Sequence, residues 1–346
     1  MLTRMLLTVG LVAAPPPVSQ PGWELIRMHN FGGCDSMSAV VPLSRSDVWA
    51  FGQSEPIDDE CAGTARPVAQ HWNGRAWRAA ELPGRRYGAI GSAGASAPDN
   101  VWAFTTSDTG ESAALRYDGR RWTDAGRSAM GPNPNLGHGL VLGRHHVWAF
   151  GSDSHAASWF WNGRTWHRRA PRDVGRTSVV SQKDVWAISC CQVTHFDGKA
   201  WKKAAFPAGR DKGTASLSGV LAVAENDVWV FGDTGERVFA AHFDGSAWSP
   251  VEVPLPASAA PGWRLGDAVA DGQGGIRVIA YPPDDTSSRV LSRSAAGQWS
   301  VSAPQVAGKV VRLWDLALVP GTTEVWAAGS VRQSESDSTS AVFAFR

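Results

Sequence analysis

Histidines are the first residues in this chain whose type could support metal binding or proton transfer. His71, His195 and His242 each lie six positions before a Trp that opens a predicted strand. Imidazole binds metals and changes its charge near neutral pH. A repeated position is spread around a repeat array, so these three cannot meet at one metal ion, and we expect structural roles. His138 and His155 lie in connections expected to share one face, which makes them candidate ligands.

Four aspartates recur just before the most regular strand pattern of the chain. They are Asp47, Asp99, Asp184 and Asp227. Aspartate side chains bond neighbouring backbone amides in turns, so we interpret these residues as turn formers. Their separation in space is unknown, so no catalytic carboxylate pair can be selected from them. We expect no catalytic residue, metal or cofactor.

Basic and aromatic residues in the connecting segments form a candidate binding surface. The arginine fork binds carboxylates bidentately, so such a surface could receive an acidic sugar or peptide carboxylates. Solvated loop charge is the alternative. Trp263 also lies in a connection, where it could stack on a ligand or cover a blade edge. The candidate ligand-binding residues are Arg85, Arg86, Tyr87, Arg127, Arg172, Arg176, Arg210 and Trp263.

The four cysteines suggest disulfide bonds, which an exported location would permit. Cys34 and Cys61 flank the first two strands of one repeat, on connections expected at the same face, so a Cys34–Cys61 bridge is predicted. Cys190 and Cys191 are adjacent, and a bridge between them would close a strained ring that is easily reduced. Buried thiols or a metal site are the alternatives for this pair.

One short pattern, Val-Trp-Ala-Phe-Gly and its variants, organises the whole chain. It recurs about every 46 residues, a spacing typical of propeller blades or helical arrays. Its β-branched and aromatic residues, ended by Gly, predict a strand and not a helix. The seven copies have their central residue at Trp49, Trp102, Trp148, Trp186, Trp229, Arg277 and Trp326.

A second pattern follows each copy and predicts a hairpin. Trp72-Asn73-Gly74-Arg75-Ala76-Trp77 is one example, and Asn-Gly or Asp-Gly between aromatic strands is a strong hairpin signal. Each repeat then has four strands, and seven four-stranded repeats around an axis make an all-β, seven-bladed propeller with antiparallel blades. The recurring tryptophans are expected to pack between neighbouring blades.

The two ends of the array predict how the ring closes. The last repeat reaches residues 341–346 and lacks a fourth strand, whereas residues 21–27, with Trp23, resemble a fourth strand without a blade. We therefore expect the N-terminal strand to complete the last blade, with Trp23 in the place that Trp77 has in the first. This arrangement removes the open junction in the ring.

The two repeated patterns together resemble the propellers of kelch proteins and of the galactose-oxidase central domain. They resemble still more a group of exported bacterial propellers with Trp-Asp-Gly-x-x-Trp hairpins, which shares no known activity. The resemblance covers nearly the whole chain after residue 22 and implies the propeller fold. The galactose-oxidase copper site needs Tyr and His ligands and a Cys–Tyr crosslink; with Tyr87, Tyr117 and Tyr281 as its tyrosines, this chain does not support that chemistry.

The N-terminal residues and the net charge indicate the location of the protein and its partners. Residues 1–20 have a basic residue and a short apolar core, typical of a secretory signal; a disordered leader is the alternative. Residues 21–346 are expected to form a single propeller domain. The net charge of +1 argues against nonspecific nucleic-acid binding, and no other segment is apolar enough to insert stably in a membrane.

The sequence favours a monomeric binding module, secreted by a bacterium, over an enzyme. It would recognise an extracellular protein or glycan through loops on one face, where function commonly lies on a rigid scaffold. A polysaccharide hydrolase or lyase and a structural cell-surface protein are the alternatives. The strands expected nearest the axis, such as residues 38–41 and 177–180, are small and apolar, which argues against converging catalytic groups.

Overall fold

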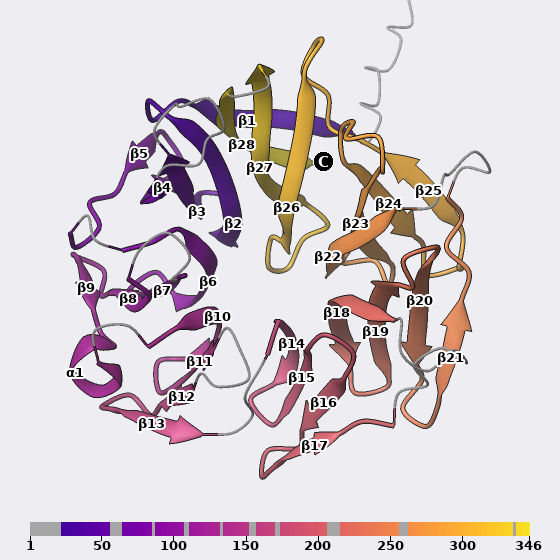
Figure 1. Ribbon diagram of the computed structural model, residues 1–346, viewed down its shortest axis with the longest axis horizontal. Helices are drawn as coiled ribbons and strands as arrows, with labels where there is room; N and C mark the ends of the chain where they lie inside the picture. Colours follow the sequence, from indigo (N-terminus) through magenta and orange to yellow (C-terminus); the bar gives the residue numbers. More distant parts are fainter. Residues whose placement is uncertain are drawn as a thin grey trace, which may run out of the picture.

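A computed structural model shows seven four-stranded antiparallel sheets arranged around a central axis (Figure 1). It describes residues 22–55, 64–84, 87–106, 111–131, 134–151, 157–169, 174–205, 215–255, 262–334 and 337–346. The predicted seven-bladed propeller is therefore confirmed. Residues 1–21 lie outside the described ranges, so the secretory leader stays a prediction. Within the described ranges, no helix is long and apolar enough to cross a lipid bilayer.

The strands fall into four positions, counted outward from the axis. The first strands are β2 (Cys34–Ser44), β6 (Ile90–Ala97), β10 (Leu136–Gly143), β14 (Arg176–Ser181), β18 (Ser216–Ala224), β22 (Arg264–Ala270) and β26 (Val310–Leu318). The second strands are β3 (Asp47–Glu55), β7 (Asn100–Thr105), β11 (His146–Gly151), β15 (Asp184–Ile188), β19 (Asp227–Asp233), β23 (Ile276–Tyr281) and β27 (Val325–Ser334).

The third and fourth positions complete each blade toward the outside. The third strands are β4 (Arg66–Trp72), β8 (Ala113–Tyr117), β12 (Ser158–Trp161), β16 (Val193–Phe196), β20 (Val238–Phe243), β24 (Arg289–Arg293) and β28 (Asp337–Phe345). The fourth strands are β5 (Trp77–Ala79), β9 (Trp122–Asp124), β13 (Trp166–Arg169), β17 (Trp201–Lys203), β21 (Trp248–Val251), β25 (Trp299–Ser302) and β1 (Trp23–His29). Blades 1 to 7 follow the order of their first strands. One short helix, α1 (Arg127–Met130), lies among the described residues.

The ring closes through the N-terminal strand, as predicted. Blade 7 has the strand order β1-β28-β27-β26, which combines the first described strand with the last three. Trp23 pairs with Phe345 in this sheet, as Trp77 pairs with Trp72 in blade 1. Closure leaves no open junction between the first and last blades.

Each blade packs on the preceding one through a tryptophan of its fourth strand. Trp122 of blade 2 lies edge-on against Trp49 of blade 1, with ring centroids 5.3 Å apart. The same edge-on contact recurs around the ring for the pairs Trp166–Trp102, Trp201–Trp148 and Trp248–Trp186, and Trp77 meets Trp326 with its ring tilted. The predicted packing role of the recurring tryptophans is therefore confirmed for these pairs, and edge-to-face geometry is a favourable one for aromatic rings.

The degenerate copy of the pattern in blade 6 replaces the aromatic contact with a cationic one. Arg277 stands where the other blades have Trp, and its guanidinium lies 3.8 Å from the ring centroid of Phe345 in blade 7. Its Nη1 donates to the Ser292 hydroxyl on the neighbouring strand at 2.9 Å. A guanidinium over an aromatic face is attractive, so a cation–π contact takes the place of the paired tryptophan rings between blades 6 and 7.

Three of the four repeated aspartates bond a histidine across their own blade, and Asp99 pairs with Arg144 of blade 3, which corrects their interpretation as turn formers. His71 Nε2 donates to Asp47 Oδ1 at 2.7 Å, and its ring stacks on Trp49 at 4.2 Å. Antiparallel pairing places His71 opposite Trp49. Asp47 lies two residues before Trp49, on the same side of the strand, so its carboxylate is within reach of the His71 ring. The same bond joins His195 to Asp184 and His242 to Asp227. The predicted structural role of the three histidines is thereby confirmed, one in each of three blades.

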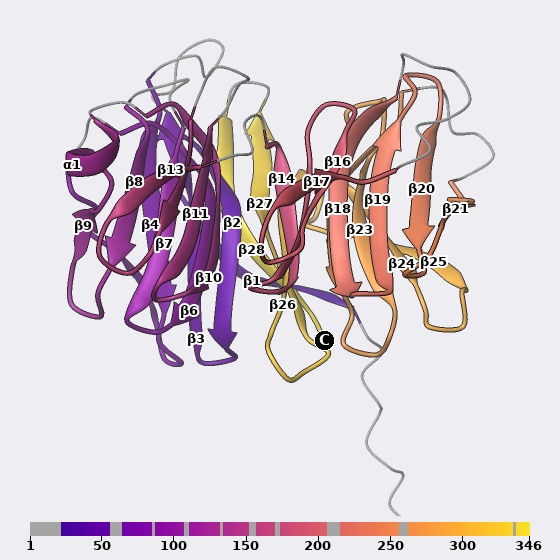
Figure 2. The same ribbon diagram turned by 90° about the horizontal axis from the view of Figure 1, so that it is seen from below.

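The ring has two distinct faces, seen from the side in Figure 2. Tight turns join first to second strands and third to fourth strands at one end, which we call the tight-turn face. The second strands end and the first strands begin at the opposite end, which we call the loop face. At hairpins such as Asp118-Gly119, the Asp side chain accepts the backbone N–H groups of residues 120 and 121, and Gly119 has a φ of 92°, which only glycine adopts easily.

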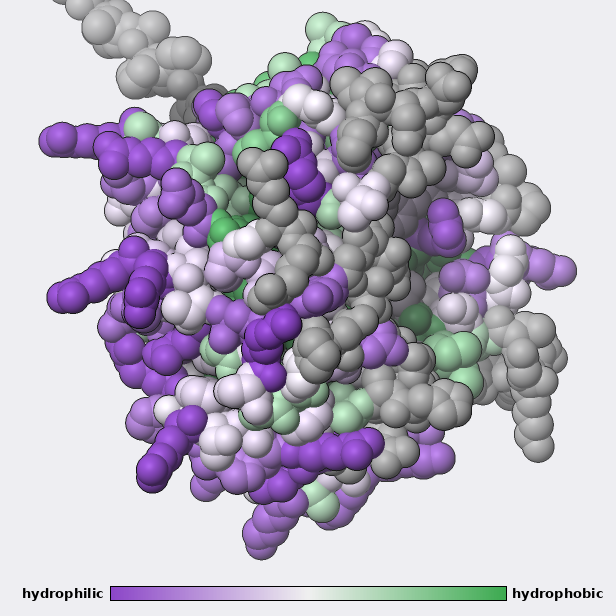
Figure 3. Space-filling view, turned by 60° about the vertical axis from the view of Figure 1, so that its left-hand side comes forward, coloured by the Kyte–Doolittle hydropathy of each residue, from purple (hydrophilic) through white to green (hydrophobic). Residues whose placement is uncertain are grey.

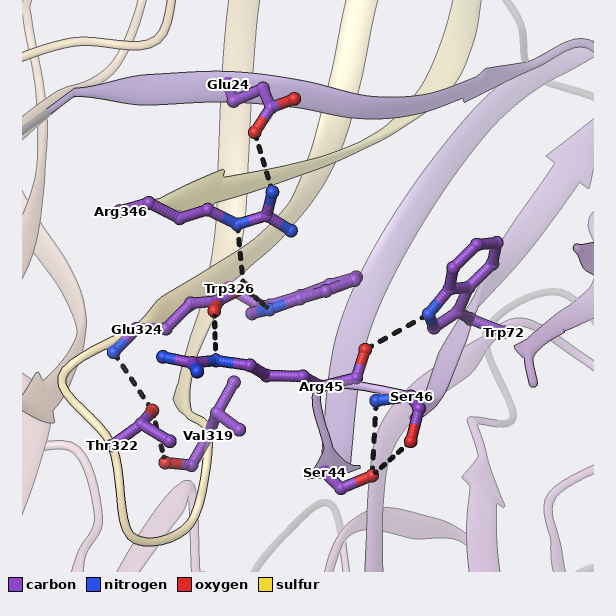
Figure 4. Close-up of polar contacts among 10 residues, drawn as sticks. All are labelled: Glu24, Ser44, Arg45, Ser46, Trp72, Val319, Thr322, Glu324, Trp326 and Arg346. Atoms are coloured by element: carbon purple, nitrogen blue, oxygen red, sulfur yellow. Dashed lines mark hydrogen bonds and ion pairs between the residues drawn. The ribbon is translucent and has the colours of Figure 1, made fainter. Parts of the chain in front are cut away.

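A polar network around Glu324 joins the closing strands on the tight-turn face (Figure 4). Glu324 is 4% exposed and accepts hydrogen bonds from Trp326 Nε1 at 2.8 Å, Arg45 Nε at 2.8 Å and Arg346 Nε at 3.0 Å. Arg346 also pairs with Glu24 of β1 at 2.9 Å. Burial would raise the pKa of Glu324, but the bonds from Arg346 and Trp326 outweigh it and lower the pKa. One carboxylate therefore connects β27, Arg346 and blade 1, and Arg346 extends the network to β1.

Replacing Glu324 with Ala is expected to lower the free energy of unfolding by about 2–3 kcal/mol, because hydrogen bonds to a charged group are lost. At least half of the side-chain surface of Arg45 and of Arg346 is exposed, which limits the free energy lost with their bonds to Glu324. A carboxylate whose pKa is lowered in the folded state stabilises the fold at pH values above its unfolded-state pKa. This stabilisation is lost as the pH falls through the folded-state pKa. Urea titrations should thus show a difference in the free energy of unfolding between the wild type and E324A at pH 7, and this difference should shrink below pH 4.5. The exposed Glu252 is the control; equal stability of E324A and E252A would contradict the network's role.

Candidate functional site

The axis of the ring is occupied by a cavity of about 510 Å³ that we call the channel. Residues from all seven first strands line it. One repeat position lies two residues after a buried apolar residue, as Asp315 follows Leu313 and His138 follows Leu136. Six of its seven members line the channel, and in blade 5 the lining residue is Val220, next to Gly219. Around the ring this position reads Ala39, Ser92, His138, Arg176, Gly219, Asp267 and Asp315.

A larger cavity of about 790 Å³ lies at the loop face, between blades 4 and 7. We call it the mouth cavity. It shares Gly175, Arg176 and Trp314 with the channel, so the two spaces meet at these residues. The remaining walls come from the loop-face ends of blades 4, 5, 6 and 7, including residues 188–190, 216–218, 264–266 and 281–283.

Three arginines line the mouth cavity, and they differ in whether an acidic residue pairs with them. Arg312 forms an ion pair with Asp285, which Arg332 also contacts. Arg176 Nη1 lies 3.4 Å from Asp267 Oδ1. Arg264 is exposed and makes no hydrogen bond or ion pair with any residue that the structure describes. Arg264 is therefore the cation in this wall whose donors stay available to a ligand.

Trp314 presents an aromatic surface between the two cavities. Its side chain is 41% exposed, unlike the buried tryptophans of the blade interfaces. A register shift between Leu313 and Asp315 interrupts the pairing of β26 at this residue, and such bulges redirect side chains. The Tyr281 ring lies 6.0 Å from Trp314, and its hydroxyl donates to the Leu313 carbonyl at 2.9 Å. Burial raises the pKa of Tyr281 to about 12, so this donor is neutral at physiological pH.

Two carboxyl groups, Asp267 and Asp315, meet in the channel wall. They lie close enough for each carboxyl group to influence the pKa of the other. Burial raises the pKa of both, and the negative charge of Asp267 raises that of Asp315 further. Two like charges in contact in a buried site do not both ionise readily, so the pair holds a proton above the usual range of aspartate.

The same carboxyl groups fasten neighbouring blades. Asp315 Oδ2 accepts the Val40 N–H of blade 1 at 2.8 Å, and Asp267 Oδ2 accepts the Leu316 N–H of blade 7 at 3.0 Å. Serines make equivalent bonds elsewhere: Ser92 accepts from Gly139 N–H at 2.9 Å, and Ser178 from Ala222 N–H at 2.8 Å. Bulged first strands leave backbone donors that need such partners, so one oxygen of each Asp has a structural role.

Replacing Asp315 with Asn should leave the protein at least as stable as the wild type at pH 8. Asn keeps an acceptor for Val40 and removes the like charge beside Asp267. A carboxyl group with a raised folded-state pKa stabilises below its unfolded value of 3.8, and this contribution is lost as pH rises through the folded pKa. D315N should therefore lose its advantage near pH 4 in urea titrations. D315L lacks the acceptor and should be destabilised at both pH values; D315N matching D315L would contradict this account.

These channel residues correct the expectation that the strands nearest the axis carry no converging polar groups. His138 also lies in the channel, where its Nε2 is 2.9 Å from the Thr177 hydroxyl. Burial, with a smaller effect of Arg176, lowers the pKa of His138 to about 4, so it is neutral at pH 7. The other candidate ligand, His155, lies outside the described residues. Across the described ranges, no three His, Cys, Asp or Glu side chains are grouped to hold a metal ion.

The structure disperses the basic residues selected from the sequence. Arg176 lines both cavities. Arg127 lies on α1 and pairs with Glu111 at 3.1 Å, and Tyr87 is 2% exposed and donates to Asp124 at 2.9 Å. Trp263 packs against the core between blades 5 and 6 and lines an outer groove of about 550 Å³. Arg85, Arg86, Arg172 and Arg210 lie outside the described residues, and their binding role stays a prediction.

The predicted bridge between Cys190 and Cys191 is wrong, since neither residue takes part in a disulfide bond. Both are exposed at the centre of the turn that joins β15 to β16. The Ser189 N–H donates to the Gln192 carbonyl across this turn at 3.0 Å, so the chain reverses without a strained ring. Cys61 lies outside the described residues, and the Cys34–Cys61 bridge stays a prediction.

Comparisons with known proteins support the fold. No family model and no curated protein sequence matches this chain. A structure of YCF48 bound to D1 peptide is 11% identical, with a TM-score of 0.64, covering 95% of this chain and 98% of that one. Virginiamycin B lyase from Staphylococcus aureus is 9% identical, with a TM-score of 0.60 and coverages of 93% and 99%. Aleuria aurantia lectin, a six-bladed propeller, is 14% identical, with a TM-score of 0.50 and coverages of 80% and 98%.

These similar structures belong to a peptide-binding protein, a lyase and a lectin, so both binding and enzymatic roles are compatible with the fold. At such identities the likeness concerns the fold alone, since one fold serves many activities. The relationship to kelch and galactose-oxidase propellers stays a resemblance in sequence pattern.

Proposed function

We propose that this chain is an exported, monomeric and non-catalytic binding module that recognises an extracellular glycan or protein at its mouth cavity. The observation that carries the proposal is that one cavity is lined by the exposed Trp314 and by Arg264, whose guanidinium has no partner among the described residues. An aromatic face can cover the apolar face of a sugar ring, and a guanidinium binds a carboxylate bidentately. The cavity therefore favours a ligand that combines a ring with a carboxylate, such as a uronic acid.

The experiment is a thermal-shift and calorimetric titration with a short uronic-acid oligosaccharide. A neutral oligosaccharide of equal length and an acidic peptide complete the panel. A ligand that binds only the folded protein raises its thermal transition. We expect the acidic oligosaccharide to raise the transition of the wild type and of R289A, and to leave W314A and R264A unshifted. Arg289 lies on a third strand and does not line the cavity. Equal shifts in all four proteins would refute the assignment to the mouth cavity, and a shift with the peptide alone would favour a protein partner.

A polysaccharide hydrolase or lyase is the second candidate, because the Asp267–Asp315 pair lies in the channel next to the mouth cavity. Carboxyl pairs perform acid–base chemistry on glycosidic bonds. Here each Asp already accepts a backbone N–H from the next blade, which favours the structural role. Product analysis with the oligosaccharide decides between them: cleavage by the wild type that is lost in D267N would establish an enzyme.

A further inference from the structure

In the hairpins that join third to fourth strands, basic residues are confined to four consecutive blades. In blades 1 to 6 a hairpin joins the third strand to the fourth, and each of these hairpins has a residue directly after its Gly. This residue is basic in blades 1 to 4 and neutral in blades 5 and 6: Arg75, Arg120, Arg164 and Lys199, then Ser246 and Gln298. All six are exposed. The repeat therefore places four cations at regular intervals along one side of the ring.

In blades 3 and 4 the fourth strands extend this positive surface from the tight-turn face along the outer edge. Blade 3 carries Arg168 and Arg169 on β13, and blade 4 carries Lys202 and Lys203 on β17, all exposed. The residue after the strand-opening Trp is Ser249 in blade 5, Ser300 in blade 6 and Glu24 in blade 7. Figure 3, with the side of blades 1 to 3 turned forward, shows hydrophilic side chains projecting along this flank. We call the hairpin and fourth-strand cations of blades 1 to 4 the basic rim.

The cations of the basic rim are largely unused by the fold. Among the described residues, Lys202 is the member that forms an ion pair, with Asp197 at 2.6 Å. The Asn or Asp side chains of the same hairpins are engaged with backbone N–H groups, as Asn73 is with residues 75 and 76. The basic rim therefore offers donors to a partner outside the chain.

Protection of strand edges does not explain the basic rim. Charged residues on an edge strand discourage pairing with other chains, and the fourth strands are the outer edges of all seven blades. Blades 5 to 7 have the same edges but carry Ser249, Ser300 and Glu24, and they even expose Leu25 and Val301. If these cations served to protect strand edges, all seven blades would need them, yet they are concentrated in four blades. The net charge of +1 conceals this separation.

We propose that the basic rim binds a flexible, linear acidic polysaccharide. The rim is convex and spans four blades, so a partner that contacts all of it must bend around the ring. Duplex DNA is stiff over about 150 base pairs, and a lipid bilayer is flat, so each would touch the convex edge over a shorter arc. A polyuronate chain can follow the curve, and its carboxylates match the arginine fork. The basic rim is separate from the mouth cavity, which lies near the axis on the loop face.

The test uses the full chain and fluorescently labelled polygalacturonate, with affinity measured by anisotropy at about 20 mM and about 200 mM salt, where screening lengths differ about threefold. The variant R120S/R164S/K199S gives three hairpins the residue that blade 5 has there. Because each lost cation reduces counterion release, we expect at least about tenfold weaker binding at low salt. The slope of log affinity against log salt should become shallower by about two.

Two variants serve as matched controls, each with its thermal transition checked for folding. R237S/R289S/K309S removes the same charge from blades 5 to 7 and should bind like the wild type, whereas S246R extends the rim and should bind more tightly. Equal weakening in the two triple variants would overturn the proposal. Binding of duplex DNA or of phosphatidylglycerol vesicles, without binding of polygalacturonate, would overturn it too. W314A should leave rim binding unchanged, which separates this result from that of the mouth cavity.

Discussion

Removal of residues 22–29 is expected to abolish cooperative unfolding of the ring. The deletion takes away β1, so blade 7 keeps three strands and the edge of β28 becomes unpaired. It also removes Trp23, which lies edge-on to Phe345 at 5.4 Å and donates to Ser302 of blade 6 at 3.1 Å. The Glu24–Arg346 ion pair is lost at the same time. Because blades are stabilised by their neighbours, the loss at one junction opens the ring.

Circular dichroism during thermal and urea unfolding measures this effect. We expect a broad transition at much lower temperature, or no transition, for the chain that begins at residue 30. A chain that lacks only residues 1–21 is the control and should unfold like the full chain. Unchanged cooperativity after the deletion of β1 would show that three strands suffice for blade 7.

Replacing Trp102 with Ala is expected to lower the free energy of unfolding by about 3–5 kcal/mol, as for other large buried aromatic residues. Trp102 is 0% exposed and contacts Trp161 and Trp166 of blade 3, with ring centroids at 5.8 and 5.5 Å. Its Nε1 donates to Asn100 Oδ1 at 3.2 Å. The change would leave a void between two blades and remove their shared aromatic contact.

Urea titration at neutral pH, followed by circular dichroism, measures the loss. Trp314→Ala is the control: Trp314 is exposed on a first strand, so its removal should change stability by less than about 1 kcal/mol. If W102A and W314A were equally stable, the packing of blades through the repeated tryptophans would not be a main source of stability.

The blades could be predicted because their signals are local. Val-Trp-Ala-Phe contains β-branched and aromatic residues, and Asn-Gly or Asp-Gly fixes the hairpin through a glycine with positive φ. The closing strand was also predictable, since Trp23 repeats a pattern whose blade is found at the other end of the array. These features need no knowledge of distant contacts.

The channel could not be predicted from the same patterns, because its residues are selected by strand bulges. The register shifts between Leu313 and Asp315 and between Leu265 and Ala268, and a local pattern does not show which side chain a bulge turns toward the axis. Aligning the first strands on their buried apolar residue would have revealed one variable polar position. The bond between His71 and Asp47 was missed for a similar reason, since it depends on the pairing of two strands.

The hydrogen bonds between Gly22 and Arg346, at 3.0 and 3.2 Å, have a consequence for how the ring forms during synthesis. Domains begin to fold from the N-terminal side while the chain is being made, yet β1 must wait for β28, more than 300 residues later. Pairing at such separation is slow because the intervening loop must first be ordered. Blade 7 is thus the last blade to be completed, and joining residues 346 and 22 by a short linker would allow the chain to be opened at another blade, which would then become the last.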